Sequence, residues 1–137
     1  MATRVGIPLL INARTDAFLV EGAPDERLDE AITRGNAYAN AGADCVYPIL
    51  AGDATTLEAL VVAIKAPINV YASTAAAPMR ELETLGVGRL SLGPGMIRAS
   101  LTTMKRVAER LLDYGSYEPF TSDVLSSDEI RRYLRET

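Results

Sequence analysis

Four short apolar runs recur along the chain, and each is followed by a stretch with helical periodicity. The runs occupy residues 7–13, 45–49, 68–71 and 89–92. None of them alternates cleanly between polar and apolar positions, which is typical of parallel strands that are buried on both faces. The pattern therefore predicts four buried parallel strands.

The intervening segments predict helices. Residues 25–41 place apolar or small side chains near a 3.6-residue period, with Pro24 at the start and Gly42 at the end. A terminal helix through Leu134 is predicted where Ser126 and Glu129 form a capping-box pattern. Further helices are predicted over residues 56–64, 78–85 and 95–114.

This order of elements indicates an α/β fold with a parallel sheet. Consecutive strands are separated by about 20 to 40 residues, the range of βαβ crossovers. Two architectures share the order: a doubly wound sheet and a (β/α)₈ barrel. Four units make only half of a barrel, so the barrel alternative requires a second half from elsewhere. Residues 1–137 are expected to form one domain, with the βα units in residues 1–116 and a connection and terminal helix in residues 117–137.

The composition is that of a globular protein and excludes several functions. Of 137 residues, 48% are hydrophobic and 23% are charged. The net charge of −4 and the absence of a Lys/Arg cluster argue against nucleic-acid binding. The chain has no histidine, which excludes histidine-based triads and zinc sites, and Cys45 alone cannot form an intrachain disulfide.

No apolar stretch is long enough to span a bilayer, and the first residues lack the apolar region of a signal peptide. We therefore expect no membrane association and a cytoplasmic location.

Candidate binding residues follow or end the predicted strands, where both architectures bind ligands. Arg14 stands where the first apolar run stops, and its planar guanidinium can bind a carboxylate or phosphate through two hydrogen bonds. A structural ion pair with Asp16 or another acid is an equally good explanation of Arg14. Asp16 itself could be a metal ligand or a base, but a role in steadying the loop is favoured.

Weaker candidates lie on the last two strands. Asn69 is polar within an apolar strand, so it can contact substrate or satisfy backbone groups. Ser91 ends the fourth strand, and Gly93 and Gly95 begin the following helix. The glycines resemble the start of a GxGxxG motif, but Arg98 replaces the third glycine. A plain strand-to-helix turn is favoured over an anion site at the helix N-terminus.

Taken together, the runs at residues 12–17 (NARTDA), 38–47 (YANAGADCVY), 67–70 (PINV) and 85–91 (LGVGRLS) resemble the isocitrate lyase and phosphoenolpyruvate mutase superfamily. The resemblance extends from about residue 6 to residue 114 and covers the C-terminal half of that family's (β/α)₈ barrel. It implies that the four strands are strands five to eight. It also implies lyase or mutase chemistry, in which a C–C or P–C bond of a small 2-oxo or 2-hydroxy acid is made or broken with Mg²⁺.

The resemblance assigns roles to two residues. The arginine of the family's ARTD motif corresponds to Arg14 and contacts the substrate's anionic group, and the strand-seven asparagine corresponds to Asn69, near the substrate. The family's Mg²⁺ ligands lie mostly on earlier strands, so no metal ligand is expected here. Where relatives place Glu or His after strand six, this chain has the apolar residues Pro48, Ile49 and Leu50.

Three hypotheses follow. The chain can be half of a Mg²⁺-dependent lyase or mutase that acts on a small carboxylate or phosphonate, inactive by itself and completed by a missing N-terminal half. It can instead be a catalytically silent half-barrel that assembles with itself or with a partner half. The third hypothesis is a doubly wound domain that binds a phosphorylated small molecule near Gly93 and Gly95.

Overall fold

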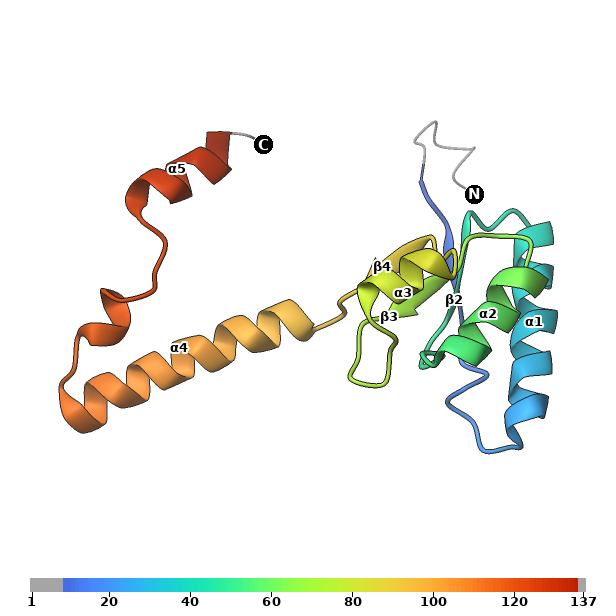
Figure 1. The fold of residues 1–137 in the computed structure, drawn as a ribbon, viewed down its shortest axis with the longest axis horizontal. Helices are drawn as coiled ribbons and strands as arrows, with labels where there is room; N and C mark the ends of the chain where they lie inside the picture. The colour runs from blue at the N-terminus through green and yellow to red at the C-terminus, as the bar shows by residue number, and fades with distance from the viewer. Residues whose placement is uncertain (1–8, 136–137) are drawn as a thin grey trace. The chain divides into compact units, whose positions relative to one another are not determined.

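The computed structural model describes residues 9–135, which form two compact units. The first unit ends at Gly93 and the second begins at Pro94. The first contains alternating strands and helices (Figure 1): β1 (Asn12–Thr15), α1 (Pro24–Asn40), β2 (Cys45–Pro48), α2 (Ala54–Ala63), β3 (Asn69–Tyr71), α3 (Met79–Thr84) and β4 (Arg89–Ser91).

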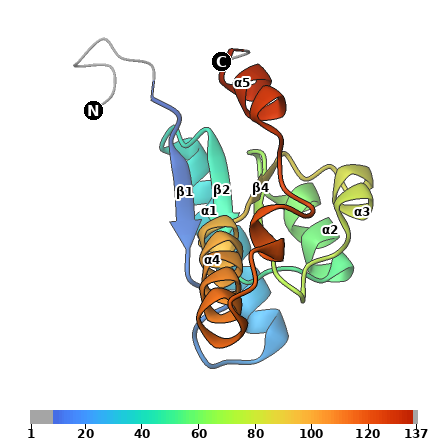
Figure 2. The ribbon, with the colours of Figure 1, turned by 90° about the vertical axis from the view of Figure 1, so that its left-hand side faces the viewer.

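The strands are parallel and follow one another in chain order. β1 pairs with β2, which lies beside it in Figure 2, and β3 pairs with β4. A parallel bridge between Val46 and Ile68 joins the two pairs. In residues 9–135 the order is thus β1-β2-β3-β4, without the reversal that defines a doubly wound sheet. A sheet that adds each new strand on the same side has the strand order of a barrel wall.

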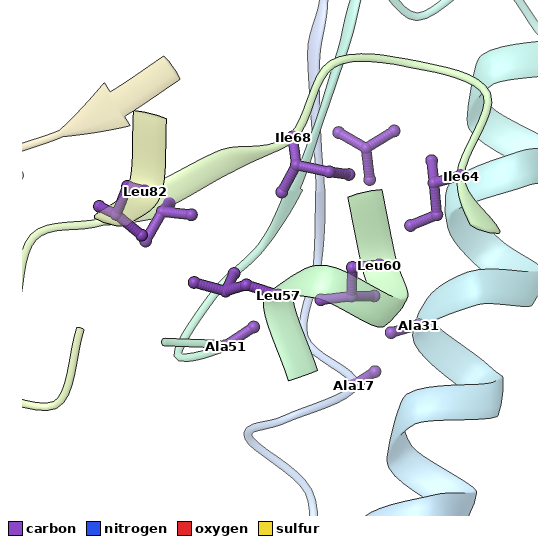
Figure 3. Close-up of a cluster of buried hydrophobic side chains, with 10 residues drawn as sticks. Ala17, Ala31, Ala51, Leu57, Leu60, Ile64, Ile68 and Leu82 are labelled. Carbon is purple, nitrogen blue, oxygen red and sulfur yellow. The ribbon is translucent and has the colours of Figure 1, made fainter. Parts of the chain in front are cut away.

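The core lies between the strands and the helices. Val46, Ile68 and Val70 are at most 1% exposed, and they pack with Leu57 and Leu60 of α2. Figure 3 shows this cluster, in which Ala31 of α1 and Leu82 of α3 also take part. Because successive side chains of a strand point to opposite sides, the strands present one face to the helices and another face away from them. We call the second face the inner face.

Local signals explain where the helices begin. The Asp53 carboxylate accepts a hydrogen bond of 2.9 Å from the backbone N–H of Thr56 and so caps α2. This bond lowers the pKa of Asp53 below its ordinary value. Pro24 opens α1, as the sequence predicts.

The second unit consists of helices. It contains α4 (Gly95–Tyr114), a 3₁₀ turn (Glu118–Phe120) and α5 (Ser127–Arg135). The predicted capping box is confirmed: Ser126 Oγ accepts from the N–H of Glu129 at 3.2 Å, and Glu129 Oε2 accepts from the N–H of Ser126 at 2.9 Å. No residue of α4 or α5 is buried, although both helices are amphipathic.

The strands and helices appear where the sequence predicts them, with one shift. The first strand was expected over residues 7–13, of which 7 and 8 lie outside the described residues, and it is found at Asn12–Thr15. Leu9 and Leu10 are exposed by 61% and 67%. The Ile11 carbonyl accepts the N–H groups of Asp44 and Cys45, and the first paired residues are Asn12 and Cys45. The first strand therefore begins only where β2 is available as a partner. Arg14 therefore lies within the strand and not after it.

Candidate functional site

The inner face collects the polar strand residues. Val46, Ile68 and Val70 point into the core, so their neighbours Tyr47 and Asn69 lie on the opposite side of the sheet. The same alternation places Arg14 on the inner face, because Arg14 is paired with Tyr47.

The register aligns four inner-face residues in a row across the strands. Arg14 pairs with Tyr47, and Asn69 pairs with Arg89. The bridge between Val46 and Ile68 brings Tyr47 beside Asn69, one residue further along both strands. We call Arg14, Tyr47, Asn69 and Arg89 the inner row. It places a guanidinium at each end of a phenol and a carboxamide, which suits an anionic ligand.

Arg14 makes the ion pair that was the alternative explanation of this residue. Its Nε lies 2.6 Å from Asp16 Oδ1, and the two side chains are 50% and 54% exposed. An exposed pair of this kind stabilises a protein by about 0.2–1 kcal/mol. The pair also orients the guanidinium and leaves its remaining N–H groups available, so it is compatible with a binding role.

Tyr47 and Tyr71 form a partly buried section of this face. Burial raises the pKa of Tyr47, the charge of Arg14 opposes that rise, and Tyr71 adds to it. Tyr47 therefore remains a neutral phenol at physiological pH and can donate a hydrogen bond. Cys45 is buried, and burial raises the pKa of its thiol although Arg89 opposes the rise. Cys45 thus behaves as a small buried residue, not as a thiolate nucleophile.

Two predicted site residues on neighbouring strands are brought together. Ser91 Oγ donates a hydrogen bond of 3.0 Å to Asn69 Oδ1. Asn69 is fully buried, and its Nδ2 has no hydrogen-bond partner among the described residues. Arg14 of β1 and Asp16, just after that strand, form a second pair, so four of the six candidate residues lie in two connected pairs.

The two candidate glycines have different surroundings. Gly93 has φ of +52°, and a Cβ at this position would lie 2.6 Å from Cε2 of Tyr71. The backbone conformation and the close tyrosine ring therefore account for Gly93. Gly95 is the first residue of α4, and a Cβ there would have no neighbour within 4 Å. Neither observation assigns a ligand to the glycines.

Sequence reasoning missed Tyr47 and Arg89. The signal that could have identified Arg89 is its position, because Arg89 directly precedes the core-facing Leu90 just as Asn69 directly precedes the core-facing Val70. A charged residue at such a position marks the inner face. The register that places Arg89 beside Asn69 was not available from the pattern.

Residues 9–135 gather no cluster of acids that would form a magnesium site by themselves. Magnesium requires several oxygen ligands in octahedral geometry. Among residues 9–135 no three His, Cys, Asp or Glu side chains come together, and Asp16 on the inner side is already paired with Arg14.

The residues of the inner row lie in a segment that matches a known family. Residues 1–112 match the profile of phosphoenolpyruvate phosphomutase. The chain belongs to this family. Its membership agrees with the resemblance to the phosphoenolpyruvate mutase and isocitrate lyase superfamily that the sequence runs indicated.

The chain spans about half the length of the relatives that it matches. The 2-methylisocitrate lyase of Vibrio cholerae is 26% identical over 96% of this chain and 44% of its own. A crystal structure from Burkholderia cenocepacia J2315, assigned as a lyase/mutase, is 32% identical with a TM-score of 0.77, over 97% of this chain and 48% of its own. A phosphonopyruvate hydrolase in complex with oxalate and Mg²⁺ shares the fold, with 24% identity and a TM-score of 0.67 over 93% and 45% of the two chains.

The matches establish a parallel α/β fold like that of the superfamily's barrels. They also establish a family of lyases and mutases that act on small carboxylates or phosphonates. No helix within residues 9–135 is both long enough and apolar enough to cross a membrane.

Proposed function

We propose that this chain is the C-terminal half, strands five to eight, of a barrel enzyme that makes or breaks a C–C or P–C bond in a small 2-oxo or 2-hydroxy acid. Residues 1–116 would supply the four βα units, and residues 117–137 the connection and terminal helix of the same domain. The observation that carries the proposal is the inner row, which presents Arg14 and Arg89 on the face of the sheet that a closed barrel would enclose.

Arg14 would bind the carboxylate or phosphonate group of the substrate. Its charge is fixed at every working pH, and its contact with Asp16 limits the rotamers of the side chain. Asn69 would donate a hydrogen bond to an oxygen of the same substrate. Both contacts would orient the reacting bond of the substrate. They would also bind its negative charge inside the barrel, where the exclusion of water makes such contacts stronger.

Magnesium in this proposal belongs to the other half of the barrel. The described residues of this chain do not fit a Mg²⁺ site, whereas one relative is known with oxalate and Mg²⁺. The metal would stabilise negative charge that develops on the substrate. The chain by itself is therefore expected to bind an anion but not to catalyse the reaction.

The absence of a carboxylate cluster from residues 9–135 favours a second candidate function, a catalytically silent half-barrel that assembles with itself or with a partner half. This candidate predicts the same fold and the same inner face. It differs in that no completed barrel would turn over substrate.

The test compares the chain alone with the chain joined behind the N-terminal half of the Vibrio cholerae lyase. Each protein receives Mg²⁺ with 2-methylisocitrate or phosphonopyruvate, and circular dichroism monitors folding. We expect no turnover by the chain alone and turnover by the joined protein, which Arg14→Ala abolishes. Turnover by the chain alone would place the metal ligands in this chain. A folded but inactive joined protein would favour the silent half-barrel.

A further inference from the structure

The hydrogen bond between Ser91 and Asn69 on the inner face determines which end of the buried Asn69 carboxamide remains available to bind a ligand. Asn69 is 0% exposed, and its Oδ1 accepts from Ser91 Oγ at 3.0 Å. Its Nδ2 is buried without a hydrogen-bond partner among the described residues. A buried polar group without a partner is uncommon, because nothing replaces its lost hydrogen bonds to water. The nitrogen end of Asn69 therefore has capacity for an acceptor that residues 9–135 do not supply.

The sheet fixes the position from which Ser91 acts. Asn69 pairs with Arg89, and Ser91 follows two residues later on the same face of β4, opposite Tyr71. The backbone of Ser91 is held in turn, because its carbonyl accepts a 2.9 Å hydrogen bond from the N–H of Ala72. A serine side chain has a single rotatable bond before its oxygen, so this hydroxyl has a short and defined reach.

We propose that Ser91 is a positioning residue that holds the carboxamide of Asn69 with its N–H groups free to donate to an anionic substrate oxygen. The inference rests on the proposed function, in which Arg14 binds the same anion. When Oδ1 of Asn69 is held toward Ser91, the amide end that remains for a ligand is Nδ2, which can only donate, so Asn69 selects a carboxylate, phosphonate or carbonyl oxygen. Without Ser91 the carboxamide can rotate by half a turn and present Oδ1, which repels such an oxygen.

The charges around Asn69 agree with this choice of ligand. Arg89 pairs with Asn69 in the ladder, and Arg14 stands at the other end of the inner row. Both are cations at working pH. A ligand oxygen that accepts from Nδ2 would thus lie in a region of positive potential, where a negative charge is favoured.

The experiment uses the full chain labelled with ¹⁵N and titrated with oxalate, without metal. The side-chain amide protons of Asn69 are identified by their absence from the spectrum of Asn69→Asp. We expect oxalate to shift them in the wild type. Ser91→Ala is expected to weaken oxalate binding roughly threefold to tenfold, the effect of losing one net hydrogen bond. Ser91→Thr keeps the hydroxyl and is expected to bind within about twofold of the wild type.

Two results would overturn the role of Ser91. The first is that Ser91→Ala binds oxalate as tightly as the wild type. The second is that Ser91→Thr loses as much affinity as Ser91→Ala, which would indicate that Ser91 acts through packing and not through its hydrogen bond. Arg14→Ala tests the proposed function separately, because unchanged oxalate binding in that variant would contradict it. In that case the role of Ser91 is still tested by the chemical shifts of the Asn69 side-chain amide protons in oxalate-free protein. If these shifts differ from the wild type in Ser91→Ala but not in Ser91→Thr, the inference is supported. If they differ in neither variant, it is overturned.

Discussion

Arg14 combines a structural contact with a proposed binding contact, and these can be separated by a conservative substitution. Arg14→Lys keeps the positive charge but replaces the planar, forked donor with a point ammonium. In a completed barrel we expect kcat/KM to fall roughly tenfold to a hundredfold, which corresponds to about 1.5–3 kcal/mol for a charge-assisted hydrogen bond. Steady-state kinetics on the joined protein measure this change.

The chain contains a matched control for Arg14. Arg34 pairs with Glu30 on α1 through the same Nε atom, and the side chains are 50% and 46% exposed, close to the values for Arg14 and Asp16. Arg34→Lys changes the same chemistry away from the inner face, so kcat/KM should not change. If Arg14→Lys lowers only thermal stability, as an exposed ion pair would predict, the binding role of Arg14 is wrong.

The two candidate glycines differ in what a methyl group would do. Gly93→Ala places a Cβ at positive φ and against the ring of Tyr71. We expect it to lower the free energy of unfolding by about 1–3 kcal/mol, because left-handed backbone and overpacking are both unfavourable for alanine. Gly95→Ala should leave stability unchanged or raise it by up to about 1 kcal/mol, because alanine favours the helix. Urea unfolding followed by circular dichroism measures the free energy of unfolding of both variants. Equal changes in the two would contradict the explanation of Gly93 by its backbone conformation and the nearby tyrosine ring.

At the scale of one element, α2 depends on the Asp53 cap. Asp53→Ala is expected to lower the free energy of unfolding by about 1 kcal/mol at neutral pH. The backbone N–H of Thr56 lowers the pKa of Asp53 in the folded chain, so its stabilisation is complete above the ordinary value of 3.8. The stabilisation is lost as the pH falls through the lower pKa of the folded state, and the difference between wild type and Asp53→Ala should shrink there.

Asp53→Asn is the control for this cap. Asparagine also accepts the hydrogen bond but does not titrate, so it should keep most of the stability without the pH dependence. Unfolding curves at several pH values would compare the three proteins. An equal loss in both variants at every pH would show that the cap is not the source of the effect.

For the whole molecule, the exposed apolar surface predicts self-association of the isolated chain. Leu9, Leu10 and Val62 of the first unit are each more than half exposed, and the strands β1 and β4 each pair on one side only among the described residues. Open strand edges and exposed apolar faces recruit partners. Multi-angle light scattering at micromolar concentration should give a mass above that of one chain, 14.7 kDa. A stable monomer would contradict the half-barrel proposal.

The sequence alone determined the parallel α/β elements and their order, because these depend on local signals. Apolar runs mark the strands, Pro24 opens α1, and Ser126 with Glu129 caps α5. The ion pair of Arg14 and Asp16 could also be predicted from the sequence, because residues two positions apart in the chain are close whatever the rest of the fold does.

Only the tertiary structure decided which residues meet on the inner face. The bridge between Val46 and Ile68 joins strands more than 20 residues apart, and it sets the register that brings Tyr47 beside Asn69. A shift by one residue would turn every side chain of a strand to the opposite face, so the inner row depends on this register. Periodicity within one strand carries no information about its neighbour. The hydrogen bond from Ser91 to Asn69, and the ring of Tyr71 against Gly93, therefore became visible only when the strands were packed together.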